Sequence, residues 1–427
     1  MHLPLLRAVL FCTPLLAAGF QAPEADAPAD APADAPANGP VVEALACPAG
    51  PDSALPNLAR GADGKVRLSW IDREGEDLGI LRFAVLEEAG WSAPREIVRG
   101  TDLFINWADF PSIAALESGV LMAHWLRDSD ADYSYDAEFA VSSDGGATWS
   151  EPRKLHDHTG GGEHGFVSIV PMDTERFGAI WLDGRDTVGR EPGAGDFALY
   201  FRSIDATGAL TDEDRLDERV CSCCQTSLVV DSSGGMLATV RDRSSAEIRD
   251  IGQFTYSPFH SEGWGLPPGA RPVHADGWRI EGCPVNGPRA ALSPAGGVAT
   301  AWFTGVGEDG GDVRLAFQER PEPYGAPIKI DGGSAVGRVD VLWLDEQSVL
   351  VTWLEDIGDA QAEWRAVRVE RDGRMGQPLV IATVPHDRST GFLRMAPDGE
   401  DLILAWTAAG ETRTDSRRVV TARLRAR

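Results

Sequence analysis

The sequence has little positive charge and, after its N-terminus, no long apolar run. Its 39 lysines and arginines stand against 66 aspartates and glutamates, which gives a formal net charge of -27. Such a surface repels phosphate backbones and anionic lipid, so we expect neither nucleic acid nor membrane surfaces as partners. No later segment is long and apolar enough to insert as a membrane helix. The six methionines are too few to indicate a methionine-rich copper shuttle.

The first 40 residues predict an export signal followed by a tether. Arg7 precedes a mostly apolar stretch, and small residues then offer a cleavage site, so residues 1–19 are expected to be a signal peptide. Residues 20–40 are rich in Pro, Ala and Asp and lack the apolar residues of a core, which predicts a disordered tether. The folded domain is expected over 41–427, in the periplasm or outside the cell.

The rest of the chain repeats one strand-like pattern seven times. Each copy is short and rich in β-branched and aromatic residues, and another apolar run precedes it. The copies cover 65–72, 119–128, 176–186, 234–244, 296–305, 347–356 and 401–410. Units of roughly 50–60 residues with three or four strands are typical of propeller blades. We therefore predict an all-β propeller with seven blades, in which 41–45 completes the last blade; a stack of β-sandwiches is the alternative.

One octapeptide is more specific than the repeats. Residues 142–149, SSDGGATW, match the Asp-box pattern S-x-D-x-G-x-x-W. In that pattern Asp and Ser side chains hold a hairpin turn, glycine supplies a positive φ, and Trp packs between sheets. The chain therefore resembles the sialidase superfamily. The resemblance implies carbohydrate substrates, exo-α-sialidase chemistry without a cofactor, and six blades, so six is the alternative to the seven repeats counted here.

The resemblance also implies a catalytic set that is only partly present. Sialidases hold a substrate carboxylate with three arginines and use a Tyr nucleophile, a Glu base and an Asp acid/base. Segment 225–241 resembles the family's base-to-arginine blade, with Arg241 retained and Gln225 in place of the Glu. Segment 336–355 resembles the nucleophile blade, with Arg338 in place of the Tyr. An amide cannot take a proton from a tyrosine, so this pair is not predicted to work in its usual form.

Propeller ligands usually bind at one mouth of the central channel, where innermost strands start and second strands end. By this rule we expect an arginine-lined funnel for a glycan or a small anion, formed by Arg127, Arg241 and Arg338. The catalytic candidates at the same mouth are Asp109, Gln225 and Tyr135. The alternative is that charges at loop ends only pair with and cap one another.

Five cysteines follow the signal peptide, and an odd number cannot all pair within the chain. Four of them, Cys221, Cys223, Cys224 and Cys283, lie at the starts of innermost strands in two neighbouring repeats, so they are expected to meet near the mouth. One interpretation is a disulfide from Cys221 or Cys223 to Cys283. Another is a thiolate metal site for Cu(I) or Zn(II), assisted by His164. A catalytic thiol is the third.

Three functions follow from these observations. The first is a sialidase-like propeller that binds a glycan or anion, with a reworked hydrolase site as one form of it. The second is a copper or zinc protein of the cell envelope that uses the cysteines as ligands. The third is a non-catalytic scaffold for protein contacts.

Overall fold

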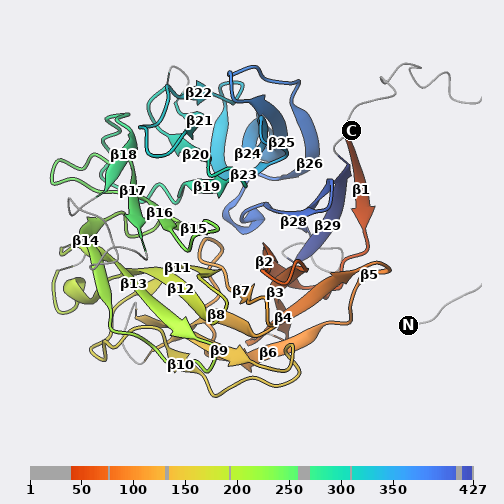
Figure 1. Ribbon diagram of the computed structural model, residues 1–427, viewed down its shortest axis with the longest axis vertical. Coiled ribbons are helices and arrows are strands. Elements are labelled where there is room, and N and C mark those ends of the chain that lie inside the picture. Colours follow the sequence, from red (N-terminus) through yellow and green to blue (C-terminus); the bar gives the residue numbers. More distant parts are fainter. Residues whose placement is uncertain are drawn as a thin grey trace, which may run out of the picture. The chain divides into compact units, whose positions relative to one another are not determined.

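The computed structural model describes residues 40–427 except 76, 130–133, 192–193, 258–269, 308–309, 410–415 and 426–427. The predicted signal peptide and nearly all of the predicted tether fall outside these ranges and stay predictions. Residues 40–427 form one unit, in which seven antiparallel sheets surround a centre (Figure 1). The all-β propeller and its seven blades are therefore confirmed, and the six-bladed alternative is wrong.

Each blade runs from an innermost strand at the channel to an outermost strand at the rim. Blade 1 contains β2 (Ser53–Arg60), β3 (Val66–Glu74), β4 (Leu78–Glu87), β5 (Gly90–Trp91) and β6 (Arg95–Gly100). Blade 2 contains β7 (Ser112–Ala115), β8 (Leu121–Asp128), β9 (Tyr135–Ser142) and β10 (Arg153–Lys154). Blade 3 contains β11 (His164–Pro171), β12 (Arg176–Asp183), β13 (Phe197–Asp205) and β14 (Asp214–Val220). Blade 4 contains β15 (Ser227–Val230), β16 (Met236–Arg241), β17 (Ile251–Tyr256) and β18 (Arg271–His274).

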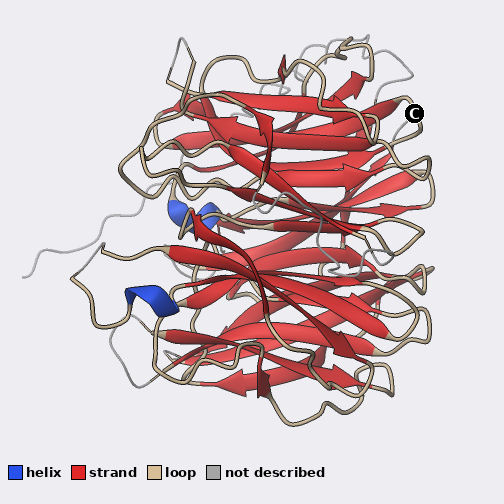
Figure 2. Cartoon of the chain, turned by 60° about the vertical axis from the view of Figure 1, so that its left-hand side comes forward, coloured by secondary structure: helices blue, strands red, loops and turns tan. Residues whose placement is uncertain are grey.

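The remaining blades follow the same order. Blade 5 contains β19 (Arg289–Leu292), β20 (Val298–Thr304), β21 (Asp312–Gln318) and β22 (Ile328–Lys329). Blade 6 contains β23 (Ala335–Trp343), β24 (Ser348–Gly358), β25 (Gln361–Glu370) and β26 (Leu379–Pro385). Blade 7 contains β27 (Arg394–Asp398), β28 (Asp401–Ala409), β29 (Arg417–Arg425) and β1 (Val41–Leu45). Strands dominate (Figure 2), and the described helices are the short 3₁₀ turns η1 (Arg185–Thr187) and η2 (Arg388–Thr390), neither of which is long or apolar enough to cross a membrane.

Buried tryptophans explain why the second strands repeat in the sequence. Six blades carry one on the second strand, each at most 9% exposed: Trp70, Trp125, Trp181, Trp302, Trp353 and Trp406. In three blades the indole N–H donates to a carboxylate two residues later: Trp70 to Asp72, Trp181 to Asp183 and Trp353 to Glu355. A buried indole N–H needs an acceptor. The acidic residues at these strand ends therefore serve the blade core.

The Asp-box forms the turn between β9 and β10 of blade 2 and packs against blade 1. The Asp144 carboxylate accepts hydrogen bonds from the Thr148 backbone and hydroxyl and from the Ser142 hydroxyl, and these bonds lower the pKa of Asp144. The two glycines of the motif have φ values of 70° and 85°, which favour glycine. Trp149 packs edge-on against Phe83 of β4 at 6.1 Å between ring centroids. The motif is a structural turn that fixes the packing of two blades.

The ring closes where the two ends of the domain pair. Strand β1 pairs antiparallel with β29 over five residues, from Val41 opposite Arg425 to Leu45 opposite Thr421. The Thr421 hydroxyl also donates to the Leu45 carbonyl at 3.0 Å. The sequence segment predicted to complete the last blade does so. Without β1, strand β29 would expose the hydrogen-bonding edge that β1 now covers.

Removing residues 1–45 should therefore lower the melting temperature relative to removing only residues 1–39. The loss of the β1–β29 hydrogen bonds should decrease it by on the order of 5 °C or more. Thermal unfolding followed by circular dichroism measures the difference. Equal melting temperatures for the two truncations would show that β1 does not stabilise the ring.

Candidate functional site

Four cysteine side chains meet in the loops that lead into β15 and β19. Cys221 Sγ lies 3.0 Å from Cys224 Sγ and 3.8 Å from Cys223 Sγ, and the Cys283 thiol forms a hydrogen bond with that of Cys223. All four are free thiols in this structure. The fold thus brings together the four cysteines that the sequence placed near one another, and we call them the thiol cluster.

The thiol cluster favours thiolates at two of its members. Hydrogen bonds from the Cys223 and Cys224 thiols hold the pKa of Cys221 well below its ordinary value, and Arg249 Nη1 donates to Cys221 Sγ at 3.3 Å. A hydrogen bond from Cys223 lowers the pKa of Cys283 to about 6. Cys221 and Cys224 are buried, whereas Cys283 is exposed. One favoured thiolate, Cys221, is therefore buried, and the other, Cys283, is reachable from solvent.

A tyrosine and two carboxyl groups lie beside the thiol cluster. The Tyr135 hydroxyl donates to Glu163 Oε2 at 3.4 Å. Burial raises the pKa of Tyr135, and the charges of Asp109 and Glu163 raise it further. Burial raises the pKa of Asp109 to about 7, and the Glu163 charge contributes. A Cβ on Gly165 would lie 2.1 Å from Asp109 Oδ2 and 2.9 Å from Tyr135 Cε2, so glycine allows these two side chains to come together.

Gln225 belongs to a recurring bridge between blades. Its amide donates to the Ala108 carbonyl at 2.7 Å and accepts from the Gly287 N–H at 3.0 Å. Asn286 and Asp109 occupy equivalent positions in blades 5 and 2, where their side-chain oxygens accept from backbone N–H groups of the following blade at 2.7 Å. The amide of Gln225 therefore links the loops that lead into blades 2 and 5, and its catalytic role stays a prediction.

Two of the predicted ligand-binding arginines are buried and already have partners. Arg241 is 1% exposed and donates to three backbone carbonyls at 2.6 to 2.9 Å. Arg338 is 5% exposed, donates to the carbonyls of Asp387 and Gly391, and lies over the Trp107 ring at 4.7 Å. Neutral carbonyls surround both guanidinium groups, and an aromatic ring covers that of Arg338. Their N–H groups therefore donate within the protein.

The third arginine is held by ion pairs. Arg127, at the end of β8, donates to Glu138 at 2.7 Å and to Asp102 at 2.5 Å. Each of the three arginines therefore donates hydrogen bonds to backbone carbonyls or carboxylates of the protein. In this structure the three arginines tie strand ends and loops together, and the arginine-lined funnel stays a prediction.

His164 does not join the cysteines as the sequence suggested. It begins β11, and its ring stacks on that of His156 at 3.6 Å between centroids. Asp136 completes a compact group with these two histidines, whose ligand atoms all lie within 4.8 Å of one another. The backbone of Tyr135 separates this group from the thiol cluster, because His164 Nδ1 lies 3.2 Å from the Tyr135 carbonyl on one side while the Tyr135 hydroxyl reaches Glu163 on the other.

Three residues of this region escaped the sequence reasoning. Glu163 directly precedes a predicted strand start, so the rule for the mouth could have included it. Asp136 lies inside an alternating strand pattern, and Arg249 lies in a loop after β16. Nothing in the sequence around either residue indicates a functional role. Long-range packing alone places Arg249 against Cys221.

No family model matches the sequence, and no curated protein matches it either. A protein of unknown function from Dyadobacter fermentans matches with a TM-score of 0.53 at 12% identity, over 91% of this chain and 100% of that chain. Polysaccharide lyase Uly1 matches with a TM-score of 0.52 at 10% identity, over 87% and 90%. A leech intramolecular trans-sialidase complexed with 2,7-anhydro-Neu5Ac matches with a TM-score of 0.46 at 10% identity, over 90% and 93%. At such identities the first two matches show the propeller fold and nothing finer.

Asp109→Asn should stabilise the protein, and more so at high pH. Folding raises the pKa of this carboxyl from 3.8 to about 7, so the folded state binds an extra proton in that window and stability falls as the pH rises through it. The amide oxygen of an asparagine can still accept the hydrogen bond from the Phe166 N–H, just as Asn286 accepts one from the Arg338 N–H. We expect a gain on the order of 2–4 kcal/mol at about pH 8 that shrinks toward pH 4.

Urea unfolding of the wild type and Asp109→Asn at several pH values measures this difference. A free-energy difference that does not change with pH would show that Asp109 is ionised in the folded protein throughout.

Proposed function

We propose that this protein is an exported, cell-envelope propeller that binds a soft metal ion through the thiol cluster. The observation that carries the proposal is the contact among the thiols of Cys221, Cys223, Cys224 and Cys283 at one end of the blades. Sulfur ligands favour Cu(I), and Zn(II) is the alternative ion.

The sulfur spacing suits a shared ion. Four sulfurs at about 2.3 Å from a tetrahedral ion lie about 3.8 Å from one another. The Cys221–Cys223 distance is 3.8 Å, and the Cys221–Cys224 distance of 3.0 Å is well beyond an S–S bond of about 2.05 Å. The sulfurs of Cys221, Cys223 and Cys224 all lie within 4.8 Å of one another, close enough to share one ion, and Cys283 would approach as a fourth ligand through its contact with Cys223.

The charges and the exposure of the thiol cluster support reversible binding. Thiolates are the metal-binding form of cysteine, and Cys221 and Cys283 have lowered pKa values. Arg249 offsets part of the negative charge at the buried end. An exposed Cys283 gives an ion a route from solvent, whereas structural zinc sites are closed. Uptake and release of Cu(I) fit this arrangement better than a permanent structural ion.

Protein exported to an oxidising compartment should contain about one equivalent of copper after anaerobic purification. Cys223→Ser should lose most of it, because Cys223 contacts the other members of the cluster. Cys47→Ser is the matched control, since Cys47 hydrogen-bonds with Thr421 near β1, away from the cluster, and should leave the copper content unchanged. Elemental analysis with thiol counting is the measurement. A metal-free protein with the four cysteines in two disulfides would rule the proposal out.

A second function, action on a glycan, is favoured by the contact between Tyr135 and Glu163 beside Asp109. Tyr135, Glu163 and Asp109 match the nucleophile, the base and the acid of sialidase-type hydrolysis, and the pKa of Asp109, about 7, keeps part of it protonated near neutral pH. The fold shared with a polysaccharide lyase supports a carbohydrate ligand. In this alternative the three groups come from blades 2 and 3 rather than from the blades that the resemblance indicated.

Cleavage of fluorogenic sialosides and arabinosides tests this second function. Tyr135→Phe and Glu163→Gln should each lower kcat/KM by about 100-fold or more, since each removes one partner of the proton transfer. Tyr200→Phe is the control, because Tyr200 packs between Trp181 and Arg185 within blade 3. Absence of turnover by the wild type between about pH 4 and 9 would eliminate glycosidase action on these substrates.

A further inference from the structure

A second cluster of metal-ligating side chains lies between β9 and β11. His156 and His164 stack with their ring planes 7° apart, and the side chains of both are 0% exposed. Asp136 of β9 approaches both rings, with Oδ1 at 3.1 Å from His156 Nε2 and at 3.9 Å from His164 Nδ1. Two apolar side chains would pack in this place about as well as two stacked imidazoles. Packing alone therefore does not explain this pair of histidines.

The hydrogen bonds of the rings set their tautomers. His156 Nδ1 lies 3.0 Å from the His158 carbonyl, and His164 Nδ1 lies 3.2 Å from the Tyr135 carbonyl. A carbonyl can only accept, so each Nδ1 carries a proton, which leaves Nε2 of each ring as the nitrogen available to a metal. This is the arrangement in which metal-binding histidines are held, with the other ring nitrogen donating to a backbone carbonyl.

One outward nitrogen, His164 Nε2, is buried without a hydrogen-bond partner. His156 Nε2 lies 3.1 Å from Asp136 Oδ1 and pairs with it. His158 Nε2, like His164 Nε2, is buried and unpaired, in a ring 5.6 Å from that of His164. Buried polar atoms without partners are rare and call for an explanation such as an ion.

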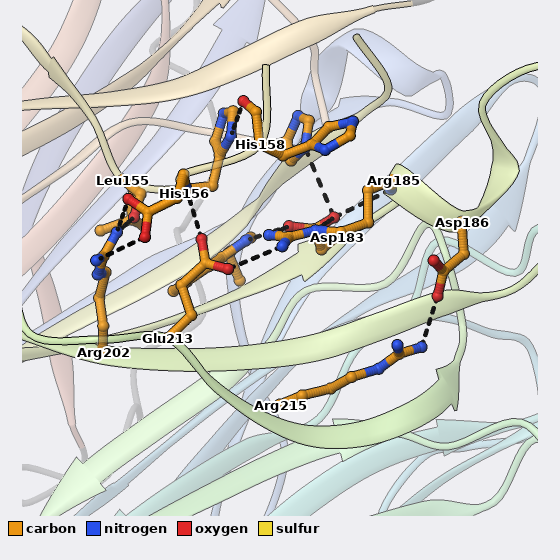
Figure 3. Close-up of polar contacts among 12 residues, drawn as sticks. Leu155, His156, His158, Asp183, Arg185, Asp186, Arg202, Glu213 and Arg215 are labelled. Atoms are coloured by element: carbon orange, nitrogen blue, oxygen red, sulfur yellow. Dashed lines mark hydrogen bonds and ion pairs between the residues drawn. The ribbon is translucent and has the colours of Figure 1, made fainter. Parts of the chain in front are cut away.

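The carboxylates around the rings are fixed from outside. Lys154 Nζ holds Asp136 Oδ2 at 2.7 Å, which leaves Oδ1 directed at the histidines. Asp183, 3.6 Å from His164 Nε2, is held by Arg185, which in turn pairs with Glu213. Figure 3 shows His156 and His158 on one side of Asp183, with Arg185 and Glu213 completing the network around that carboxylate. Such outer partners orient ligands and tune the affinity of a site for its metal.

We propose that His156, His164 and Asp136 form a second metal site, which binds Zn(II). Two imidazoles and one carboxylate oxygen are a donor set that zinc takes in proteins, and the neighbouring His158 ring or a water fills the fourth position. His156 Nε2 already faces Asp136 Oδ1, whereas His164 Nε2 faces Asp183, so the His164 ring would turn to bring its Nε2 to the same ion. The site does not depend on the proposed copper function, because it shares no residue with the thiol cluster and uses nitrogen and oxygen donors.

Titration of the chelator-stripped full-length protein with Co(II), followed by displacement with Zn(II), tests this site. Four-coordinate Co(II) with nitrogen and oxygen ligands shows visible d–d bands, and only thiolate ligands add a sulfur-to-metal charge-transfer band. In Cys223→Ser we expect one equivalent of Co(II) with d–d bands and no charge-transfer band, and Zn(II) should displace it. His156→Gln in this background should weaken Zn(II) binding by more than about 10-fold.

His386→Gln is the matched control, because His386 is an exposed histidine 3.3 Å from a carboxylate, Asp356, and should leave the binding unchanged. Asp136→Asn is the second ligand variant and should also weaken Zn(II) binding. If His156→Gln does not fold, the Co(II) spectrum of Cys223→Ser and an increase of its melting temperature with Zn(II) decide the matter. Absence of Co(II) binding in folded Cys223→Ser, or binding that survives both ligand substitutions, would overturn the proposal. A finding that the thiol cluster binds no copper would not affect the Zn(II) result, because the two sites share no residue.

Discussion

Closure of the ring by β1 and β29 is the constraint on which the other features of the structure depend. A blade exposes both faces of its sheet until neighbours cover them, and the first and last blades become neighbours only when the chain ends pair. Around the closed ring, side-chain oxygens of one blade accept from backbone N–H groups of the next. Asp109, Gln225 and Asn286 share this role. The residues whose N–H groups donate lie near the starts of the innermost strands. Two of them, Phe166 and Arg338, have φ values of 52° and 57°, so the backbone there directs the N–H toward the preceding blade.

This bridging changes how the polar residues of the strand ends are understood. Carboxylates at the ends of second strands accept hydrogen bonds from buried indoles. Arg241 and Arg338 donate to backbone carbonyls. These charged groups therefore stabilise the blades. Among the described residues, three neighbouring groups have chemistry that the blade contacts do not use: four thiols, a tyrosine beside a glutamate, and two stacked histidines. Asp109 combines both roles, since it bridges blades with a carboxyl where the equivalent positions have amides, and burial then raises its pKa to about 7.

The two proposed metal sites differ in donor softness and in access, although one backbone segment at Tyr135 separates them. The thiol cluster opens to solvent through Cys283, which suits exchange of a soft ion. The histidine group is enclosed and held by Lys154 and by the Asp183–Arg185 pair, which suits an ion that stays. Bound zinc would link β9 to β11 and so stabilise the junction of blades 2 and 3 that also carries Tyr135 and Glu163.

The amino-acid sequence by itself determined the propeller, the seven blades, the strand that closes the ring and the meeting of four cysteines. These properties follow from local strand patterns and from their repetition, since equivalent positions in successive blades must lie at equivalent places around the axis. Only the tertiary structure decided what each polar side chain does. Arg241 and Arg338 look like free ligands in the sequence because backbone carbonyls, their actual partners, carry no sequence signal. His164 was grouped with the cysteines because both lie at strand starts, whereas its neighbours come from β9 and from a loop. Which buried polar groups pair with each other depends on distances between blades. The periodicity of the sequence carries no information about those distances.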